Sequence, residues 1–216
     1  MGRAAGKPLR VGVLASGVGT NLQALLDTVH GHEALVVAVA ADQPTAGALA
    51  RARAAGVQTA VFARGDYPDR GARDAAIADW LHGHDVQLVV LAGYMALLTS
   101  PFLSRFPDAV VNVHPSLLPA FPGVRAIEQA IDYGVKVFGV TVHFVLDDGG
   151  VDTGPVIVQG AIELADATDA DAVQEALRPV EHTLLPEAVR LIARGALSRD
   201  PDNPRRIVVA AHDTPA

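Results

Sequence analysis

The chain has 216 residues, half of them hydrophobic and 19% charged, which fits one α/β domain with a large buried core and excludes a disordered chain. Its formal net charge is -7 and its Lys and Arg residues do not cluster, which argues against a nucleic-acid backbone as partner. With no cysteine, disulfides, thiolate nucleophiles and thiolate metal sites are excluded as well. No apolar stretch resembles a secretion signal or reaches membrane-spanning length, so we expect a cytoplasmic protein that does not bind a membrane.

Short apolar runs rich in Val alternate with helical patterns in the first half of the chain. The runs that predict strands are Leu9 to Ala15, Ala34 to Ala41, Gln58 to Phe62, Val86 to Ala92 and Ala109 to Val113. Apolar residues on one helical face follow the first strand and precede the fourth. Because strands that alternate with helices are joined by right-handed crossovers, this half predicts a Rossmann-like, mostly parallel twisted sheet with helices on both faces.

The second half predicts an antiparallel portion. A helical stripe ends at Gly134, and two long strand-like runs, Lys136 to Leu146 and Gly154 to Ile162, can pair around the loop Asp147 to Thr153. A final helical pattern contains Pro179 and Pro186, so we expect a kink or two helices there. The whole chain, residues 1–216, is expected to form a single α/β domain with residues 1–8 and 198–216 as peripheral ends.

A glycine loop, SGVGTN, joins the first strand to the first helix. Glycines let the backbone approach a ligand closely, and a helix N-terminus favours an anion. The dinucleotide fingerprint requires a third glycine where Leu22 stands, and the Lys-Ser/Thr pair of the P-loop is absent. A small phosphate monoester held by Gly19, Thr20 and Asn21 therefore fits better than NAD or ATP. A turn and helix cap that binds nothing remains an alternative.

The segment Asn112 to Pro119 ends the fifth predicted strand with an amide and an imidazole two residues apart. Alternation places Asn112 and His114 on one face, at the carboxyl end of the strand, where open α/β sheets build their sites. A structural role is the alternative, because polar residues commonly terminate strands.

The acidic turn DDGGVDTGP is the second candidate segment. Asp147 and Asp148 read as ordinary hairpin residues, whereas Asp152 directly precedes the next apolar run and can turn inward. An Asp, a His and an Asn without a Ser or Cys nucleophile suggest acyl transfer directly to a bound amine, with no metal. That chemistry must deprotonate the amine, stabilise an oxyanion and protonate a leaving nitrogen.

At these residues the sequence resembles the phosphoribosylglycinamide formyltransferase family. The matching segments, in family order, are SGVGTN, VVLAGYM, NVHPSLLPAFPG, TVHFV, VDTGPVIVQ and EHTLLP. They span nearly the whole chain, although the SLLP core is shared with related formyl-folate enzymes. The resemblance implies a single formyltransferase domain that takes glycinamide ribonucleotide and 10-formyltetrahydrofolate as substrates in purine synthesis. A homodimer stays open.

The resemblance also implies roles for individual residues. Asn112 would donate to the formyl oxygen, His114 would stabilise the oxyanion as an imidazolium, and Asp152 would hold His114 and accept the amine's proton. Gly19, Thr20 and Asn21 would hold the phosphate of the ribonucleotide, and Glu181 its ribose or amine end, with a solvated helix position as the alternative for Glu181. The folate would be bordered by a further set of residues: Arg70, Met95, Ala96, Leu97 and Leu98. His143 and the remaining histidines are taken as structural.

Three positions depart from the family pattern. Ala96 stands where many relatives carry Arg or Lys, so one folate or phosphate contact is expected to be missing. Arg125 stands at a position that is often His, where it either adds positive charge near the site or faces solvent. Pro179 lies close to Glu181 and bears on the placement of that carboxylate.

Three other functions are alternatives. A formyltetrahydrofolate hydrolase would use water in place of the amine, and such relatives usually carry an extra N-terminal regulatory domain. A tRNA formyltransferase would need a further C-terminal domain and a basic surface. A non-catalytic binder of a nucleotide or folate predicts that Asn112, His114 and Asp152 do not converge in space.

Overall fold

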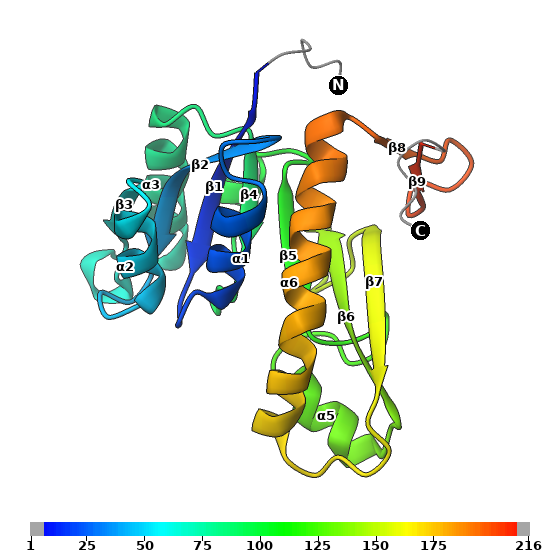
Figure 1. The fold of residues 1–216 in the computed structure, drawn as a ribbon. Helices are drawn as coiled ribbons and strands as arrows, with labels where there is room; N and C mark the ends of the chain where they lie inside the picture. The colour runs from blue at the N-terminus through cyan, green and yellow to red at the C-terminus, as the bar shows by residue number, and fades with distance from the viewer. Residues whose placement is uncertain (1–6, 211–216) are drawn as a thin grey trace. The chain divides into compact units, whose positions relative to one another are not determined.

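The computed structural model describes residues 7–210, and the chain divides into two compact units, one ending at Asn112 and the other beginning at Val113 (Figure 1). Strand β5 runs across the division, so its last two residues belong to the second unit. We describe each unit by itself.

The first unit is a parallel sheet with helices between its strands. Its elements are β1 (Leu9–Ala15), α1 (Thr20–Thr28), β2 (Ala34–Ala41), α2 (Gly47–Ala54), β3 (Gln58–Val61), the 3-10 helix η1 (Arg64–Asp66), α3 (Arg70–Gly83), β4 (Leu88–Leu91), α4 (Ser100–Leu103) and β5 (Val110–His114). The strands lie in the order β3-β2-β1-β4-β5, and each pair is parallel. Both faces of β1 and β4 are buried, which is why these strands read as continuous apolar runs.

The second unit contains an antiparallel pair and a long helix. Its elements are α5 (Ala126–Tyr133), β6 (Val137–Phe144), β7 (Val156–Glu163), α6 (Ala170–Arg194), β8 (Leu197–Arg199) and β9 (Ile207–Val209). Strand β6 pairs with β7 in antiparallel register, with an irregularity between Val142 and His143. Together with the parallel first unit, this confirms the expected α/β, Rossmann-like class with a mostly parallel sheet and an antiparallel C-terminal portion.

Helix α6 is continuous over 25 residues, with Pro179 and Pro186 inside it (Figure 1). Of the two expected outcomes, a kink or two helices, two helices is wrong. The helix has a buried stripe that includes Pro186, whereas Pro179 is exposed. The other members of the stripe include Val173, Leu177, Leu185, Ala188 and Leu191. The helix packs along β6 and β7. This packing outweighs the cost of about 3 kcal/mol that an interior proline imposes on a helix.

The chain beyond α6 forms a small hairpin within the described residues. Strands β8 and β9 pair in antiparallel register, and a bridge joins Arg206 to Val156 at the start of β7. The prediction of peripheral ends also concerns residues 1–6 and 211–216, which lie outside the described residues. In residues 7–210, no helix is both long and apolar enough to cross a membrane.

Candidate active site

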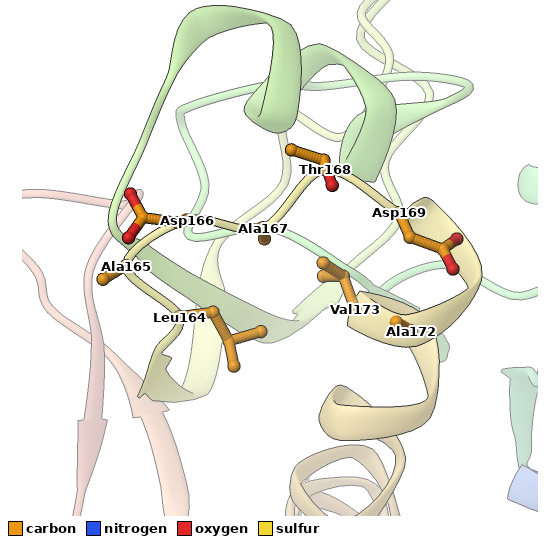
Figure 2. A pocket seen from close by; sticks show the side chains of 8 residues that line it. All are labelled: Leu164, Ala165, Asp166, Ala167, Thr168, Asp169, Ala172 and Val173. Atoms are coloured by element: carbon orange, nitrogen blue, oxygen red, sulfur yellow. The ribbon is translucent and has the colours of Figure 1, made fainter.

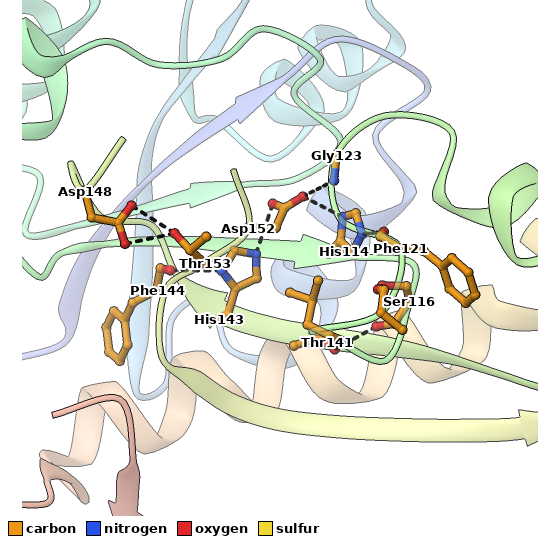
Figure 3. A network of polar contacts seen from close by, with 12 residues as sticks. His114, Ser116, Phe121, Gly123, Thr141, His143, Phe144, Asp148, Asp152 and Thr153 are labelled. Carbon is orange, nitrogen blue, oxygen red and sulfur yellow. Dashed lines mark hydrogen bonds and ion pairs between the residues drawn. The ribbon is translucent and has the colours of Figure 1, made fainter. Parts of the chain in front are cut away.

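One carboxylate and two imidazoles meet in the second unit, at the loop between β6 and β7 (Figure 3). His114 Nδ1 lies 3.3 Å from Asp152 Oδ2, and His143 Nε2 lies 3.4 Å from Asp152 Oδ1. All three side chains are largely buried, with Asp152 the most exposed at 11%. Sequence reasoning thus placed His114 and Asp152 together correctly, whereas the contact of His143 with Asp152 was missed.

His114 is held from both ring nitrogens. Its Nε2 lies 2.8 Å from the carbonyl oxygen of Phe121, while Nδ1 faces the carboxylate of Asp152. Both neighbours accept hydrogen bonds, so the ring satisfies them together only when both nitrogens carry protons. The geometry therefore suits an imidazolium at this position. Asn112 lies two residues earlier in the same strand, and alternation gives it the same face of β5.

The backbone brings Asp152 into position through an unusual conformation. Its φ of 55° is left-handed, a region that Asp tolerates better than most residues. Two residues on, Gly154 packs against β6 so closely that an added Cβ would lie 1.7 Å from the carbonyl oxygen of Phe144. The main-chain N–H of Gly123 donates to Asp152 Oδ2 at 2.7 Å. The carboxylate is thereby fixed by backbone on one side and imidazoles on the other.

Opposing effects act on the pKa of Asp152. Burial raises it, but hydrogen bonds from His143 and from the Gly123 N–H, together with the charges of His114 and His143, bring the pKa down from 3.8 to about 2. The lowering contributions win because the carboxylate has donors on both oxygens. Asp152 is therefore ionised throughout the neutral range and can act as a proton acceptor or as a fixed negative charge beside His114.

In the first unit, the glycine loop is shaped by α2. Gly19 has a φ of 81°, and an added Cβ would lie 2.6 Å from Cα of Ala48. Arg51 Nε donates to the carbonyl oxygen of Val18 at 2.9 Å, and the N–H of Ala48 donates to the carbonyl oxygen of Gly17. The loop is thus fixed against α2 directly before the first turn of α1, where N–H groups favour an anion.

The residues expected to border the folate lie in the same unit. Arg70 begins α3 and is exposed, and Met95 is 76% exposed at the segment that follows β4. Buried Asp74 supports the end of that segment, because its Oδ2 accepts hydrogen bonds from both the N–H and the hydroxyl of Thr99. Of the remaining expected residues, Leu97 is exposed and Ala96 and Leu98 are half-buried.

A family model described as formyl transferase matches residues 9–189. The chain is 43% identical to a phosphoribosylglycinamide formyltransferase of Mycobacterium tuberculosis over 187 residues, 86% of each protein. The chain belongs to the phosphoribosylglycinamide formyltransferase family. It is also similar to the crystal structure of glycinamide ribonucleotide transformylase 1 from Symbiobacterium toebii, with 44% identity, a TM-score of 0.87 and 94% of each chain covered.

Other relatives are longer than this chain. A trifunctional purine biosynthetic protein adenosine-3 of Bos taurus is 39% identical over 193 residues, which are 88% of this chain and 19% of that protein. The chain therefore spans about a fifth of the length of this relative.

Three residues singled out in the sequence can be located in the second unit. Glu181 is buried on α6 and accepts a hydrogen bond from Gln174 Nε2 at 3.1 Å, so the alternative of a solvated helix residue is wrong. Arg125 faces solvent, and its Nε lies 3.4 Å from Oε1 of Glu128. The carbonyl oxygen of Pro179 accepts a hydrogen bond from the hydroxyl of Thr183, one turn further along the helix, and Glu181 lies between these two residues in the sequence.

The loop after His114 is held by a side-chain network that sequence reasoning also missed. The hydroxyl of Thr141, fully buried in β6, donates to the carbonyl oxygen of Ser116 at 2.7 Å and accepts from the N–H of Leu118 at 3.1 Å. Gln159 Nε2, on β7, donates to the Leu118 carbonyl oxygen and to the Thr141 hydroxyl. Alternation along β6 was the available signal, because Thr141 and His143 lie two residues apart on one face.

Replacing Thr141 with Val is expected to lower the free energy of unfolding by about 2 kcal/mol, because the Ser116 carbonyl and the Leu118 N–H would lose their buried partner. Urea denaturation of both proteins measures the difference. Thr141→Ser, which keeps the hydroxyl, is the control and should lose less stability. A Val variant as stable as the wild type would contradict this role for the network.

The lowered pKa of Asp152 predicts an acid-dependent loss of stability. Because the folded pKa, about 2, lies below the ordinary 3.8, the ionised carboxylate stabilises the fold above about pH 4. That contribution disappears as the pH falls from about 4 to 2, and amounts to about 2 kcal/mol. The unfolding free energy of Asp152→Asn should therefore depend less steeply on pH across this window than that of the wild type. Parallel curves would contradict the assignment.

The second unit has a cavity at the start of α6. It has a volume of about 380 Å³ and lies between the segment before α6 and the first turn of that helix (Figure 2). Its lining is Leu164, Ala165, Asp166, Ala167, Thr168, Asp169, Ala172 and Val173. Within residues 7–210, no group of three or more His, Cys, Asp or Glu side chains is arranged to hold a metal ion.

Proposed function

We propose that this chain transfers the formyl group of 10-formyltetrahydrofolate directly to the amine of glycinamide ribonucleotide, in de novo purine biosynthesis. The observation that carries the proposal is the buried pairing of His114 with an ionised Asp152, two residues after Asn112 in β5. The proposal is supported by the family to which the chain belongs and by the names of the relatives that it resembles. The proposal includes a cytoplasmic location; a homodimer stays open.

The proposed reaction proceeds through one tetrahedral intermediate. The amine nitrogen of the ribonucleotide attacks the formyl carbon, forming a C–N bond and placing negative charge on the formyl oxygen. The Asn112 amide and the His114 imidazolium donate to that oxygen. The amine loses one proton to Asp152, directly or through water. Asp152 passes this proton on to N10 of the folate, by the same route, as the bond from the carbon to N10 breaks, and so ends ionised again. Atoms and charges balance without a covalent enzyme intermediate.

His114 must change its acceptor for this chemistry. Its Nε2 faces the carbonyl oxygen of Phe121, while Nδ1 faces Asp152. The formyl oxygen would take the place of the Phe121 carbonyl, and Asp152 would keep the ring oriented from the other side. His143 would steady Asp152 from its second oxygen. The buried surroundings strengthen these charge interactions relative to water.

Substrate binding is proposed for the residue sets identified above. The ribonucleotide phosphate would bind the N–H groups and side chains of Gly19, Thr20 and Asn21 at the start of α1, and Glu181 would bind its ribose or amine end. The folate would lie along Arg70 and the segment of Met95, Ala96, Leu97 and Leu98. Because Ala96 has no charge, Arg70 would carry most of the attraction for the folate's acidic tail.

The test is an assay of the purified chain with 10-formyltetrahydrofolate, following absorbance of the deformylated folate with and without glycinamide ribonucleotide. Product that forms only when the ribonucleotide is present would support the transferase. Equal product without it would replace the proposal with a hydrolase. An absence of product in both cases would overturn it in favour of a binder or of another acceptor amine. Ping-pong kinetics with a trapped formyl-enzyme would overturn direct transfer.

A further inference from the structure

The loop that carries Asp152 is anchored at the residue after the carboxylate (Figure 3). The hydroxyl of Thr153 donates to the carboxylate of Asp148 at 2.9 Å, and the N–H of Gly150 donates to the same carboxylate at 3.0 Å. These bonds close the loop on itself. They hold the Thr153 side chain but leave its carbonyl oxygen to a donor from elsewhere in the chain.

That donor is Arg205, from the hairpin at the end of the second unit. Its Nη2 donates to the carbonyl oxygen of Thr153 at 2.5 Å. The next residue, Arg206, bridges Val156 at the start of β7 through the backbone. The hairpin is therefore attached on both sides of Gly154, the residue that packs against the Phe144 carbonyl.

The hairpin has a turn of its own that presents Arg205. Asp200 Oδ1 accepts hydrogen bonds from the N–H groups of Asp202 and Asn203, and Asn203 Oδ1 accepts from the N–H of Arg205. The N–H of Arg206 donates to the carbonyl oxygen of Asn203. This local bonding orders the turn, so less conformational entropy is lost when Arg205 reaches Thr153.

The left-handed backbone of Asp152 explains why such an anchor matters. A residue with a side chain in this conformation is higher in energy by roughly 1–2 kcal/mol and persists only where its surroundings hold it. Gly123 holds the carboxylate, Asp148 holds the Thr153 hydroxyl, and Arg205 holds the Thr153 carbonyl. Arg205 is the member of this set that comes from beyond the region matched by the formyl transferase model, which ends at residue 189.

We infer that Arg205 is a positioning residue for formyl transfer, which fixes the backbone after Asp152 and so keeps the carboxylate facing His114. The inference rests on the proposed function for its kinetic consequence. Its structural consequence, a loop held by the C-terminal hairpin, does not depend on which reaction the chain catalyses.

The test compares Arg205→Ala with Arg206→Ala in the full chain. Arg206 is the matched control, because its side chain carries the same charge but contacts Asp200 within the hairpin, with Nη1 3.4 Å from Oδ2. Arg205→Ala is expected to lower kcat about tenfold with little change in KM, because the reacting groups lose alignment. Arg205→Lys should restore part of the rate, and Arg206→Ala should match the wild type.

Amide hydrogen exchange gives a readout that is independent of activity. The Gly123 N–H, bonded to Asp152, should exchange about tenfold faster in Arg205→Ala, while the Leu118 N–H, bonded to Thr141, keeps its wild-type rate. Unchanged exchange at Gly123, equal acceleration at both amides, or the same result for Arg206→Ala would each overturn the inference. If the wild type shows no formyl transfer, the proposed function fails, and exchange at Gly123 still decides whether Arg205 holds the loop.

Discussion

Asp152→Asn is expected to lower kcat by about 100-fold or more, as is typical when a proton-handling group is lost. Asn has nearly the same shape and tolerates the left-handed backbone of this position, so the change removes the negative charge with little strain. It also turns an amide N–H₂ group or a weaker acceptor toward rings that face a carboxylate in the wild type. Single-turnover kinetics with saturating substrates would measure the chemical step directly.

The matched control for this experiment is Asp147→Asn, which removes the same charge from an exposed position in the same loop. It should keep a rate within about twofold of the wild type, because solvent and salt screen an exposed charge. Thermal unfolding at neutral pH would show that both variants are folded. A near-normal rate in Asp152→Asn would remove this carboxylate from the mechanism and leave His114 without a proton partner.

His114→Ala is expected to cause a comparable loss, about 100-fold or more in kcat, because it removes a donor to the developing oxyanion. The effect should fall mainly on kcat, since the interaction strengthens as charge develops on the formyl oxygen. His32→Ala, which changes an exposed imidazole, serves as the control and should be indistinguishable from the wild type.

Added imidazole provides a second readout for the same variant. The ring of His114 is buried between Asp152 and the Phe121 carbonyl, so its removal leaves a space with an acceptor at each end. Imidazole in solution should restore part of the rate in His114→Ala, and more effectively where it is protonated. A variant that works at the wild-type rate without imidazole would exclude His114 from oxyanion stabilisation.

Much of the fold could be predicted because its signals are local. The first two strands have the predicted bounds, Leu9–Ala15 and Ala34–Ala41, since Val-rich runs between helical patterns are typical of buried parallel strands. The fourth predicted strand, Val86 to Ala92, is shorter in the structure, Leu88–Leu91, because apolar residues continue past the paired segment. A continuous helix α6 could not be predicted in this way. Its continuity through two prolines depends on packing against β6 and β7, and a local sequence pattern carries no information on that packing.

The candidate site also has residues that the sequence predicts and residues that it does not. The pairing of His114 with Asp152 could be anticipated from motifs that end a strand and a loop. His143 was interpreted as structural, because one imidazole in an apolar strand carries no sign of its partner. Its contact with Asp152 depends on the backbone of the following loop, where Asp152 takes a left-handed conformation. Arg205 lies in a Pro-containing stretch that reads as a tail unless the turn formed by Asp200 and Asn203 is recognised.

The close approach of Gly154 to the Phe144 carbonyl has a consequence for directed evolution of this loop. Any side chain at position 154 would collide with main chain, so clones altered there would be lost to misfolding regardless of their chemistry. Val151, by contrast, is 41% exposed, and Asp147 is exposed as well. A library that randomises positions 147 and 151 and keeps residues 152–154 constant would therefore sample new loop surfaces while most of its members still fold.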